Sequence, residues 1–145
     1  MKKIKGNRYT LFSLWDTYRN LHPFMSLVYP EQQSDMVQSM IDMYSEYGWL
    51  PHWECFSKEK GVMNGDPACV VINDTYQRGI RDFDIEKGYN AMIHNSKFVY
   101  IVDKELDRKN VEYIRKAVKP YWDHNGYIPS DYKTKGGDVW GSVST

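Results

Sequence analysis

"DMVQSMIDMYSEYG", residues 35–48, is the stretch that decides the fold, because its apolar residues recur at the spacing of one helical face. This stripe consists of Met36, Val37, Met40, Ile41, Tyr44 and Tyr47. We expect the helix to begin at about Glu31 or Ser34, with Ser34 or Asp35 as its N-cap, and to end at Gly48, a residue type favoured at helix C-termini. Since a methionine-rich helical face usually packs on its neighbours, the stretch predicts a core helix.

The same helical spacing recurs on both sides of this segment, in residues 13–27, 66–79, 84–94 and 107–124. Pro23 is a candidate kink in the first of these helices, and Asp66 followed by Pro67 is typical of a helix start. The expected inward residues are Leu14, Tyr18, Leu21 and Met25 in the first helix, Ala68, Val71, Ile72, Thr75 and Tyr76 in the next, and Ile85, Tyr89, Met92 and Ile93 in the third. Together the segments predict an all-α fold of helical hairpins.

Two other segments fit that pattern less well. Residues 97–103 form a short apolar run with the composition of a strand, and residues 127–145 show no helical period. The stretch 48–67, "GWLPHWECFSKEKGVMNGDP", is a long loop punctuated by glycine and proline. Because long loops in compact domains are usually functional or disordered, and this one holds two tryptophans, a histidine and a glutamate, we expect it to be functional.

Composition excludes several classes of function. The chain has 145 residues, enough for one domain, with 19 basic and 19 acidic residues and therefore no net charge, which argues against nucleic-acid binding. No apolar stretch is long enough for a membrane span, and the N-terminal residues lack the apolar region of a signal peptide. Two cysteines and four widely spaced histidines indicate neither a disulfide framework nor a metal site.

The best chemical grouping combines acids with tryptophans at the starts of helices or between them. It consists of Trp15–Asp16, His52–Trp53–Glu54 and Gly65–Asp66. In a hairpin array these joints lie at one end, so the groups can converge. A carboxylate accepts hydrogen bonds from hydroxyls while an indole covers an apolar face, so the grouping suits a polyhydroxylated ring.

Each member of the grouping also has a simpler interpretation. Asp66 has the position of a helix N-cap, Glu54 suits an exposed loop acid, and Arg19 stands one turn from Asp16 at a spacing that favours an ion pair. These alternatives remain open on the residue pattern alone.

Six segments, in this order, resemble the catalytic domain of glycoside hydrolase family 92, the bacterial α-mannosidases. They are "FSLWDTYRNLHP", "DMVQSMIDMYSEYGWLPHWE", "VMNGDPACVVINDTYQRGI", "FDIEKGYNAM", "GYIP" and "SVST". The resemblance runs from about residue 8 to residue 145 and is weaker between 95 and 125. "FSLWDT", "GWLPHWE" and "GDP" at these spacings are its most specific part.

The resemblance implies an (α/α)₆ barrel, of which this chain is an incomplete part. It also implies calcium-dependent, exo-acting release of mannose from α-mannosides, for example α-1,2-linked ones, with inversion at the anomeric carbon. Asp16 matches the family's mannose-contacting aspartate and Trp53 matches its site tryptophan. Trp15, His52, Glu54 and Asp66 would shape or support that wall.

Motifs that carry the family's chemistry are missing from the sequence. Its general acid lies in a motif resembling "EGNxWQ", its general base in one resembling "GNDD", and further contacts in a "NEP" motif. The family's N-terminal β-sandwich is missing as well. We therefore expect residues 1–145 to be a partial catalytic domain with no catalytic residue of its own, inactive alone, that holds no calcium by itself.

The expected partner is a mannose-containing glycan, with neither nucleic acid nor membrane. Apolar hairpin faces left uncovered by missing helices would favour self-association. Two alternatives stay open: a non-catalytic helical domain that binds carbohydrate or protein, and a different (α/α) barrel hydrolase acting on another sugar. Members of the family are commonly exported, but the sequence does not give the compartment.

Overall fold

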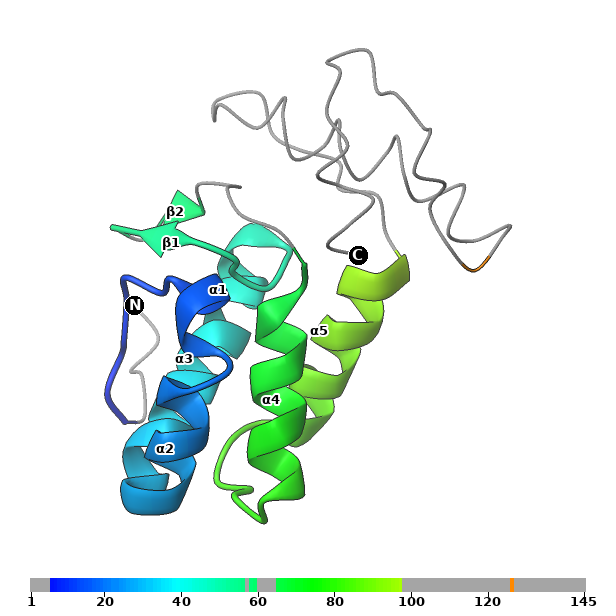
Figure 1. Ribbon diagram of the computed structural model, residues 1–145. Coiled ribbons are helices and arrows are strands. Elements are labelled where there is room, and N and C mark those ends of the chain that lie inside the picture. Colours follow the sequence, from blue (N-terminus) through cyan, green and yellow to red (C-terminus); the bar gives the residue numbers. More distant parts are fainter. Residues whose placement is uncertain (1–5, 57, 60–64, 98–125, 127–145) are drawn as a thin grey trace.

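The computed structural model describes residues 6–56, 58–59, 65–97 and 126. Over these residues the fold is helical (Figure 1), as the all-α prediction requires. The helices are α1 (Leu14–Thr17), α2 (Leu21–Val28), α3 (Pro30–Tyr47), α4 (Pro67–Gln77) and α5 (Ile85–Lys97). Strands β1 (Glu54–Cys55) and β2 (Lys58–Glu59) form a small antiparallel sheet inside the predicted loop. The predictions for residues 98–103, 107–124 and 127–145 lie outside the described residues.

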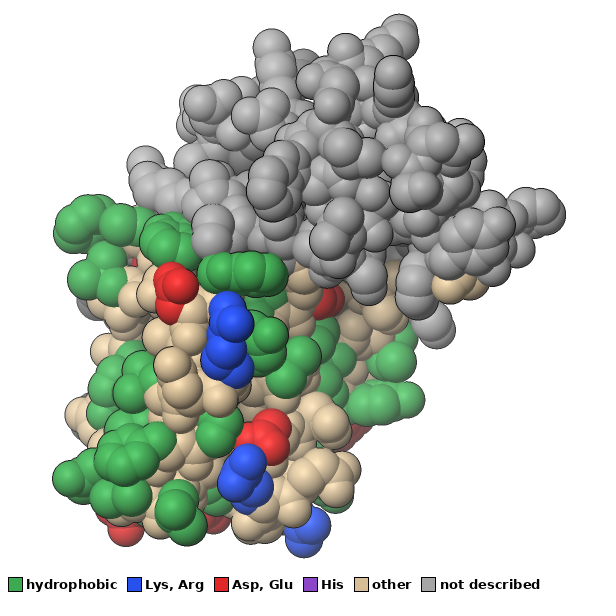
Figure 2. Space-filling view, in the orientation of Figure 1, with side chains coloured by type: hydrophobic (Ala, Val, Ile, Leu, Met, Phe, Trp, Pro, Cys, Tyr) green, Lys and Arg blue, Asp and Glu red, His purple; other side chains and the backbone are tan. Residues whose placement is uncertain are grey.

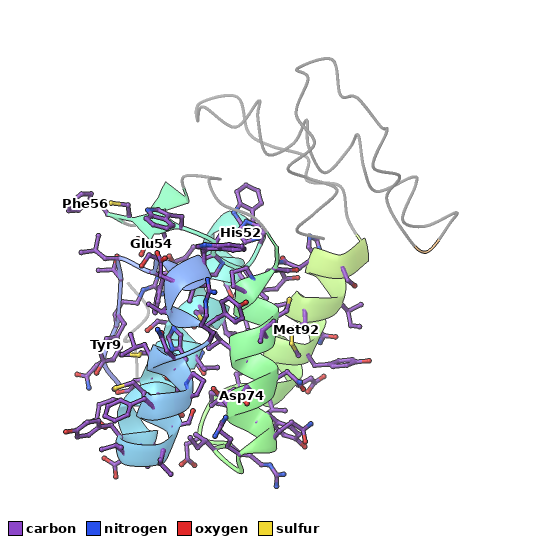
Figure 3. The ribbon with its side chains drawn as sticks, viewed as in Figure 1. Tyr9, His52, Glu54, Phe56, Asp74 and Met92 are labelled. Carbon is purple, nitrogen blue, oxygen red and sulfur yellow. The ribbon has the colours of Figure 1, made fainter. Side chains whose placement is uncertain are left out.

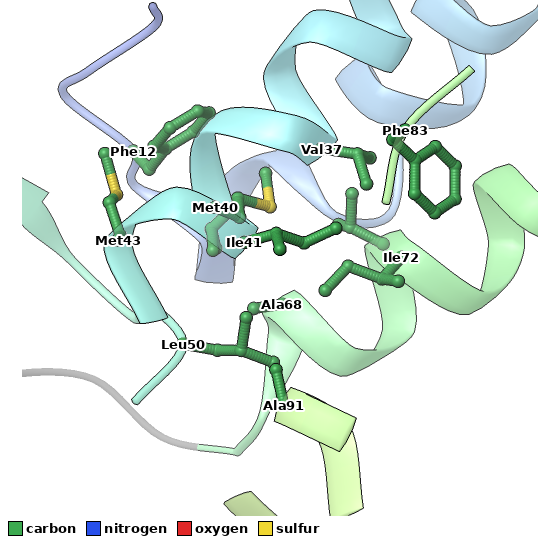
Figure 4. Packing of buried hydrophobic residues seen from close by; sticks show 12 residues of the cluster. Phe12, Val37, Met40, Ile41, Met43, Leu50, Ala68, Ile72, Phe83 and Ala91 are labelled. Atoms are coloured by element: carbon green, nitrogen blue, oxygen red, sulfur yellow. The ribbon is translucent and has the colours of Figure 1, made fainter. Parts of the chain in front are cut away.

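Helix α3 is the centre of the bundle, and it packs against α2, α4 and α5. Val37, Met40 and Ile41 of the predicted stripe are fully buried, and the side chains around them fill the core (Figure 4). The core consists of Phe12, Leu14, Val37, Met40, Ile41, Met43, Leu50, Ala68, Val71, Ile72, Phe83 and Ala91. The periodicity of residues 35–48 thus identified the element on which the fold is built.

The ends of α3 were predicted with mixed success. Gly48 ends it in the left-handed conformation, with φ 87°, as expected. The helix begins earlier than predicted, at Pro30, whose fixed φ suits a first helical position. The predicted N-caps are therefore wrong: Ser34 is buried inside the helix, and Asp35 uses its carboxylate to accept hydrogen bonds from Asn7.

The single helix predicted over residues 13–27 is two helices, α1 and α2. A turn at residues 18–20 separates them, and Asn20 Oδ1 accepts a hydrogen bond from the Leu21 amide at 2.6 Å. Pro23 lies in the first turn of α2, where an amide has no partner within the helix, so it does not interrupt α2. The break thus comes before the proline that was expected to cause a kink.

Helix α4 buries its predicted face, and α5 does so only in part. Ala68, Val71 and Thr75 of α4 are buried as expected. On α5, Ile85 and Tyr89 are exposed, whereas Met92 packs against the core as predicted. Buried positions on the same helix are also held by small residues, which a hydrophobic pattern misses. One of them is Gly88, where an added Cβ would lie 3.1 Å from Cδ1 of Ile41, so the helices approach closely there.

An apolar patch covers α2 (Figure 2), made by Leu21, Phe24, Leu27 and Val28, which are 42–79% exposed. The prediction that Leu21 faces inward is therefore wrong. Such a face is consistent with the expected self-association, which stays a prediction. In the part of the chain that the structure describes, no helix combines the length and apolar character needed to cross a membrane.

A buried polar network joins three helices through His22 of α2, Gln33 of α3 and Thr75 of α4. Gln33 donates from Nε2 to the Thr75 hydroxyl at 2.9 Å, so its Oε1 accepts from His22 Nδ1 at 3.1 Å. The proton of the neutral imidazole is therefore on Nδ1. Nε2 is buried and has no hydrogen-bond partner among the described residues. Protonating the ring would add an N–H at Nε2, where no described residue accepts a hydrogen bond from it.

We expect this network to make the fold sensitive to acid. Burial lowers the pKa of His22 below its ordinary value of 6.5, and the hydrogen bond to Gln33 opposes this shift. Between the folded and unfolded pKa values the unfolded chain binds more protons, so stability falls as pH drops below about 6.5. The free energy of unfolding, measured in urea, should fall less between pH 7.5 and pH 5 in His22→Gln than in the unmutated chain. Equal losses would exclude His22 as a source of the acid sensitivity.

Candidate functional site

Two segments far apart in sequence pair at one end of the bundle. The Leu14 amide donates to the His52 carbonyl at 3.2 Å, and the Glu54 amide donates to the Phe12 carbonyl at 3.0 Å. Ser13 and Trp53 face each other between these two bonds. We call residues 12–14 and 52–54, joined in this way, the site ladder. Figure 3 shows His52 and Glu54 at this end of the molecule, away from Asp74 on α4.

The ladder brings together two of the three predicted groups. Helix α1 begins at Leu14, directly after the paired residue Ser13, and its first turn carries Trp15 and Asp16. Leu14 is fully buried and anchors this turn, whereas the Asp16 side chain is exposed and Trp15 is half-buried. Trp53 on the other segment is also half-buried. The ladder thus places Trp53 beside the residue that leads into Trp15 and the exposed carboxylate of Asp16.

Arg19 does not pair with Asp16, contrary to the prediction from spacing. Its guanidinium carbon lies 5.5 Å from the ring centroid of Trp15 and 5.4 Å from that of Tyr18, and it donates to the Trp15 carbonyl at 3.3 Å. A planar guanidinium stacks well on aromatic faces. Among the residues that the structure describes, Asp16 makes no ion pair, and it is exposed.

The third predicted group, Asp66, joins the site through a buried cluster. Asp66 Oδ1 lies 3.8 Å from Nε2 of His52 and accepts a hydrogen bond from Asn95 Nδ2 at 3.1 Å. Asn95 in turn accepts from the Leu50 amide at 3.1 Å. Asp66 is the N-cap residue of α4, as predicted, although its side chain makes no capping hydrogen bond. The carboxylate instead binds Asn95 of α5 and lies close to His52.

Asn95 is a residue that the sequence reasoning missed. It is buried near the end of α5 and connects the loop at Leu50 with Asp66. A polar residue late in a helical pattern is the only signal that the sequence offered, and it is a weak one. Only the folded chain shows that this asparagine holds two parts of the site together.

Glu54 is buried, so the interpretation as an exposed loop acid is wrong. Only 1% of its surface is exposed, and its carboxylate accepts hydrogen bonds from the hydroxyl of Thr10 and the amide of Leu11. Its position supports the site from within the protein. It cannot present its carboxylate to solvent as Asp16 does.

The site offers no metal centre within the part of the chain that is described. No group of three or more histidine, cysteine, aspartate or glutamate side chains is placed there to hold an ion. Asp16, Glu54 and Asp66 use their carboxylates separately. The described residues therefore do not by themselves fit the calcium ion that the family resemblance implies.

Comparisons with known proteins identify the family. The model of the "Glycosyl hydrolase family 92 catalytic domain" matches residues 1–145. This chain belongs to glycoside hydrolase family 92. The family assignment made from "FSLWDT", "GWLPHWE" and "GDP" is thereby confirmed. No curated protein matches the chain.

Solved structures of family 92 enzymes share the fold. The α-mannosidase BT3965 from Bacteroides thetaiotaomicron, in complex with mannoimidazole, is 32% identical with a TM-score of 0.70 over 90% of this chain. The inverting mannosidase BT2199 from Bacteroides thetaiotaomicron VPI-5482 is 33% identical with a TM-score of 0.67 over 88% of this chain. The chain spans only 16% of each of those proteins. It is thus similar to one part of an α-mannosidase.

Proposed function

We propose that this chain forms part of the mannose-binding wall of a family 92 α-mannosidase. Asp16 accepts hydrogen bonds from hydroxyls of the terminal mannose, and Trp53 packs against the apolar face of the ring. Trp15, His52 and Asp66 shape that wall. The observation that supports the proposal is the site ladder, because it pairs the segment that leads into Trp15–Asp16 with the segment that carries His52–Trp53. The mannoimidazole complex of BT3965, a structural neighbour, supports the choice of sugar.

The complete enzyme would release mannose from the end of an α-mannoside, with inversion and with calcium. An inverting glycosidase needs one carboxylic acid to protonate the leaving oxygen and a second carboxylate to activate water, about 6.5–9.5 Å away. The described carboxylates of this chain are engaged elsewhere or stand alone, so neither role is assigned to them. The part of this chain is to hold the sugar by its hydroxyls and its apolar face while groups from the rest of the domain cleave the bond.

The chain alone is expected to bind the sugar without cleaving it. Isothermal titration of the 145-residue chain with mannoimidazole should give weak, saturable binding, and the glucose-configured imidazole should bind more weakly, because its C2 hydroxyl points the other way. Incubation with α-1,2-mannobiose and calcium should release no mannose. Calcium-dependent release by the pure chain would contradict the missing acid and base, and absence of binding would contradict a preformed wall.

A further inference from the structure

The carboxylate of Glu54 lies beneath the site ladder and is linked to the segment that enters it. The Thr10 hydroxyl lies 2.8 Å from each carboxylate oxygen, and the Leu11 amide donates to Oε2 at 2.7 Å. A buried carboxylate is stable only where donors replace the water that it has lost, and hydrogen bonds to a charged acceptor are the strong ones. Glu54 thus binds the chain immediately before Phe12.

Leu11 has an unusual backbone at this contact. Its φ is 66°, in the left-handed region that residues other than glycine rarely adopt. Its side chain is 56% exposed, so packing of that side chain does not account for the conformation. The hydrogen bond from the Leu11 amide to Glu54 does, because it fixes the direction of the amide. Such backbone conformations persist where surrounding contacts determine them, and they cluster at functional sites.

The bend at Leu11 aims the chain into the ladder. Directly after it, Phe12 accepts from the Glu54 amide, so the backbone and the side chain of one residue hold both sides of the bend. Ser13 then pairs with Trp53, and Trp15 and Asp16 follow on α1. Glu54 itself is buried and stands behind the wall.

We propose that Glu54 is a positioning residue, which holds Trp15–Asp16 beside His52–Trp53 by fixing the bend at Leu11. Its use in sugar binding rests on the function proposed above. The competing interpretation is that Glu54 only stabilises the fold as a whole. The two differ in where a substitution acts: loss of positioning loosens the ladder, whereas loss of general stability loosens the core equally.

Hydrogen exchange and sugar binding together test the proposal in the 145-residue chain. In Glu54→Ala, protection of the backbone amides at positions 14 and 54 should fall at least about tenfold while the amides of Met40 and Ile41 on α3 keep theirs. The dissociation constant for mannoimidazole should rise about tenfold or more. Glu54→Gln should restore most of the amide protection and most of the affinity for mannoimidazole. The side-chain carbonyl of glutamine can accept from the Leu11 amide, and its NH₂ group can donate to the Thr10 hydroxyl.

Two outcomes would overturn the proposal. Unchanged protection of the ladder amides in Glu54→Ala would show that Glu54 does not hold the bend. An equal fall in the protection of ladder and core amides, with unchanged sugar affinity of the folded protein, would show that Glu54 only stabilises the fold as a whole. If the unmutated chain binds no mannoimidazole, the proposed function fails, and the protection pattern still decides the positioning role.

Discussion

Replacing Asp16 by alanine is expected to lower kcat/KM for α-mannosides about 100-fold in a complete family 92 catalytic domain that contains this chain. The carboxylate is exposed at the start of α1 and makes no ion pair among the described residues, so it can accept hydrogen bonds from sugar hydroxyls. Hydrogen bonds to a charged group contribute about 1.5–3 kcal/mol, and 1.4 kcal/mol is about tenfold in an equilibrium constant. Steady-state kinetics with α-1,2-mannobiose measures the effect.

The matched control for Asp16 is Asp82, also an exposed aspartate. It lies in the connection between α4 and α5, at the end of the bundle opposite the site ladder (Figure 1). Asp82→Ala should change kcat/KM less than about twofold, since a distant surface substitution removes no contact with the sugar. Normal rates for Asp16→Ala would remove Asp16 from the site and favour a non-catalytic role for this wall.

The central helix was predictable because its signal is local. Val37, Met40 and Ile41 repeat at the helical period within one segment, and all three are buried. The same reasoning failed on part of α5, where Gly88 faces the core and Tyr89 faces outward, although Met92 packs inward as predicted. Close packing of two helices favours a small residue, which carries no hydrophobic signal. Periodicity therefore predicts the buried face of a helix with large core residues more reliably than that of a helix that packs on the core through small residues.

The sequence singled out residues for the candidate site, but it did not show how they are connected. The pattern of acids next to tryptophans singled out Asp16 and Trp53, and the family resemblance implied mannose as the ligand of both. The ladder that joins them depends on pairing between distant segments, which no local pattern contains. The burial of Glu54 and the hydrogen bond between Asp66 and Asn95 likewise depend on distant segments that come together only in the folded chain. Sequence spacing alone suggested an ion pair between Asp16 and Arg19. In the structure Arg19 stacks on Trp15 instead.

Replacing Gln33 by alanine is expected to destabilise the fold by about 3 kcal/mol. Gln33 is fully buried on α3 and is hydrogen-bonded to both His22 and Thr75. Alanine leaves a cavity and deprives two buried groups of their partner, and an unsatisfied buried donor or acceptor costs about 1–3 kcal/mol. Urea unfolding at pH 8, where His22 is neutral in both states, measures the change as a shift of the midpoint.

The neighbouring residue provides the control. Gln32 stands on the same helix and is exposed, so Gln32→Ala should change the free energy of unfolding by less than about 0.5 kcal/mol. Equal effects of the two substitutions would show that the buried network contributes nothing to stability.

A third variant separates the cavity from the hydrogen bonds. Gln33→Met restores most of the lost volume with a flexible apolar side chain but offers His22 and Thr75 only a weak acceptor. If the unpaired groups dominate, the variant should remain destabilised by about 2 kcal/mol. If the cavity dominates, methionine should recover nearly all of the stability. We expect the first result, because Nε2 of His22 is already without a partner among the described residues. Losing the bond at Nδ1 would then leave both nitrogens of a buried ring unsatisfied.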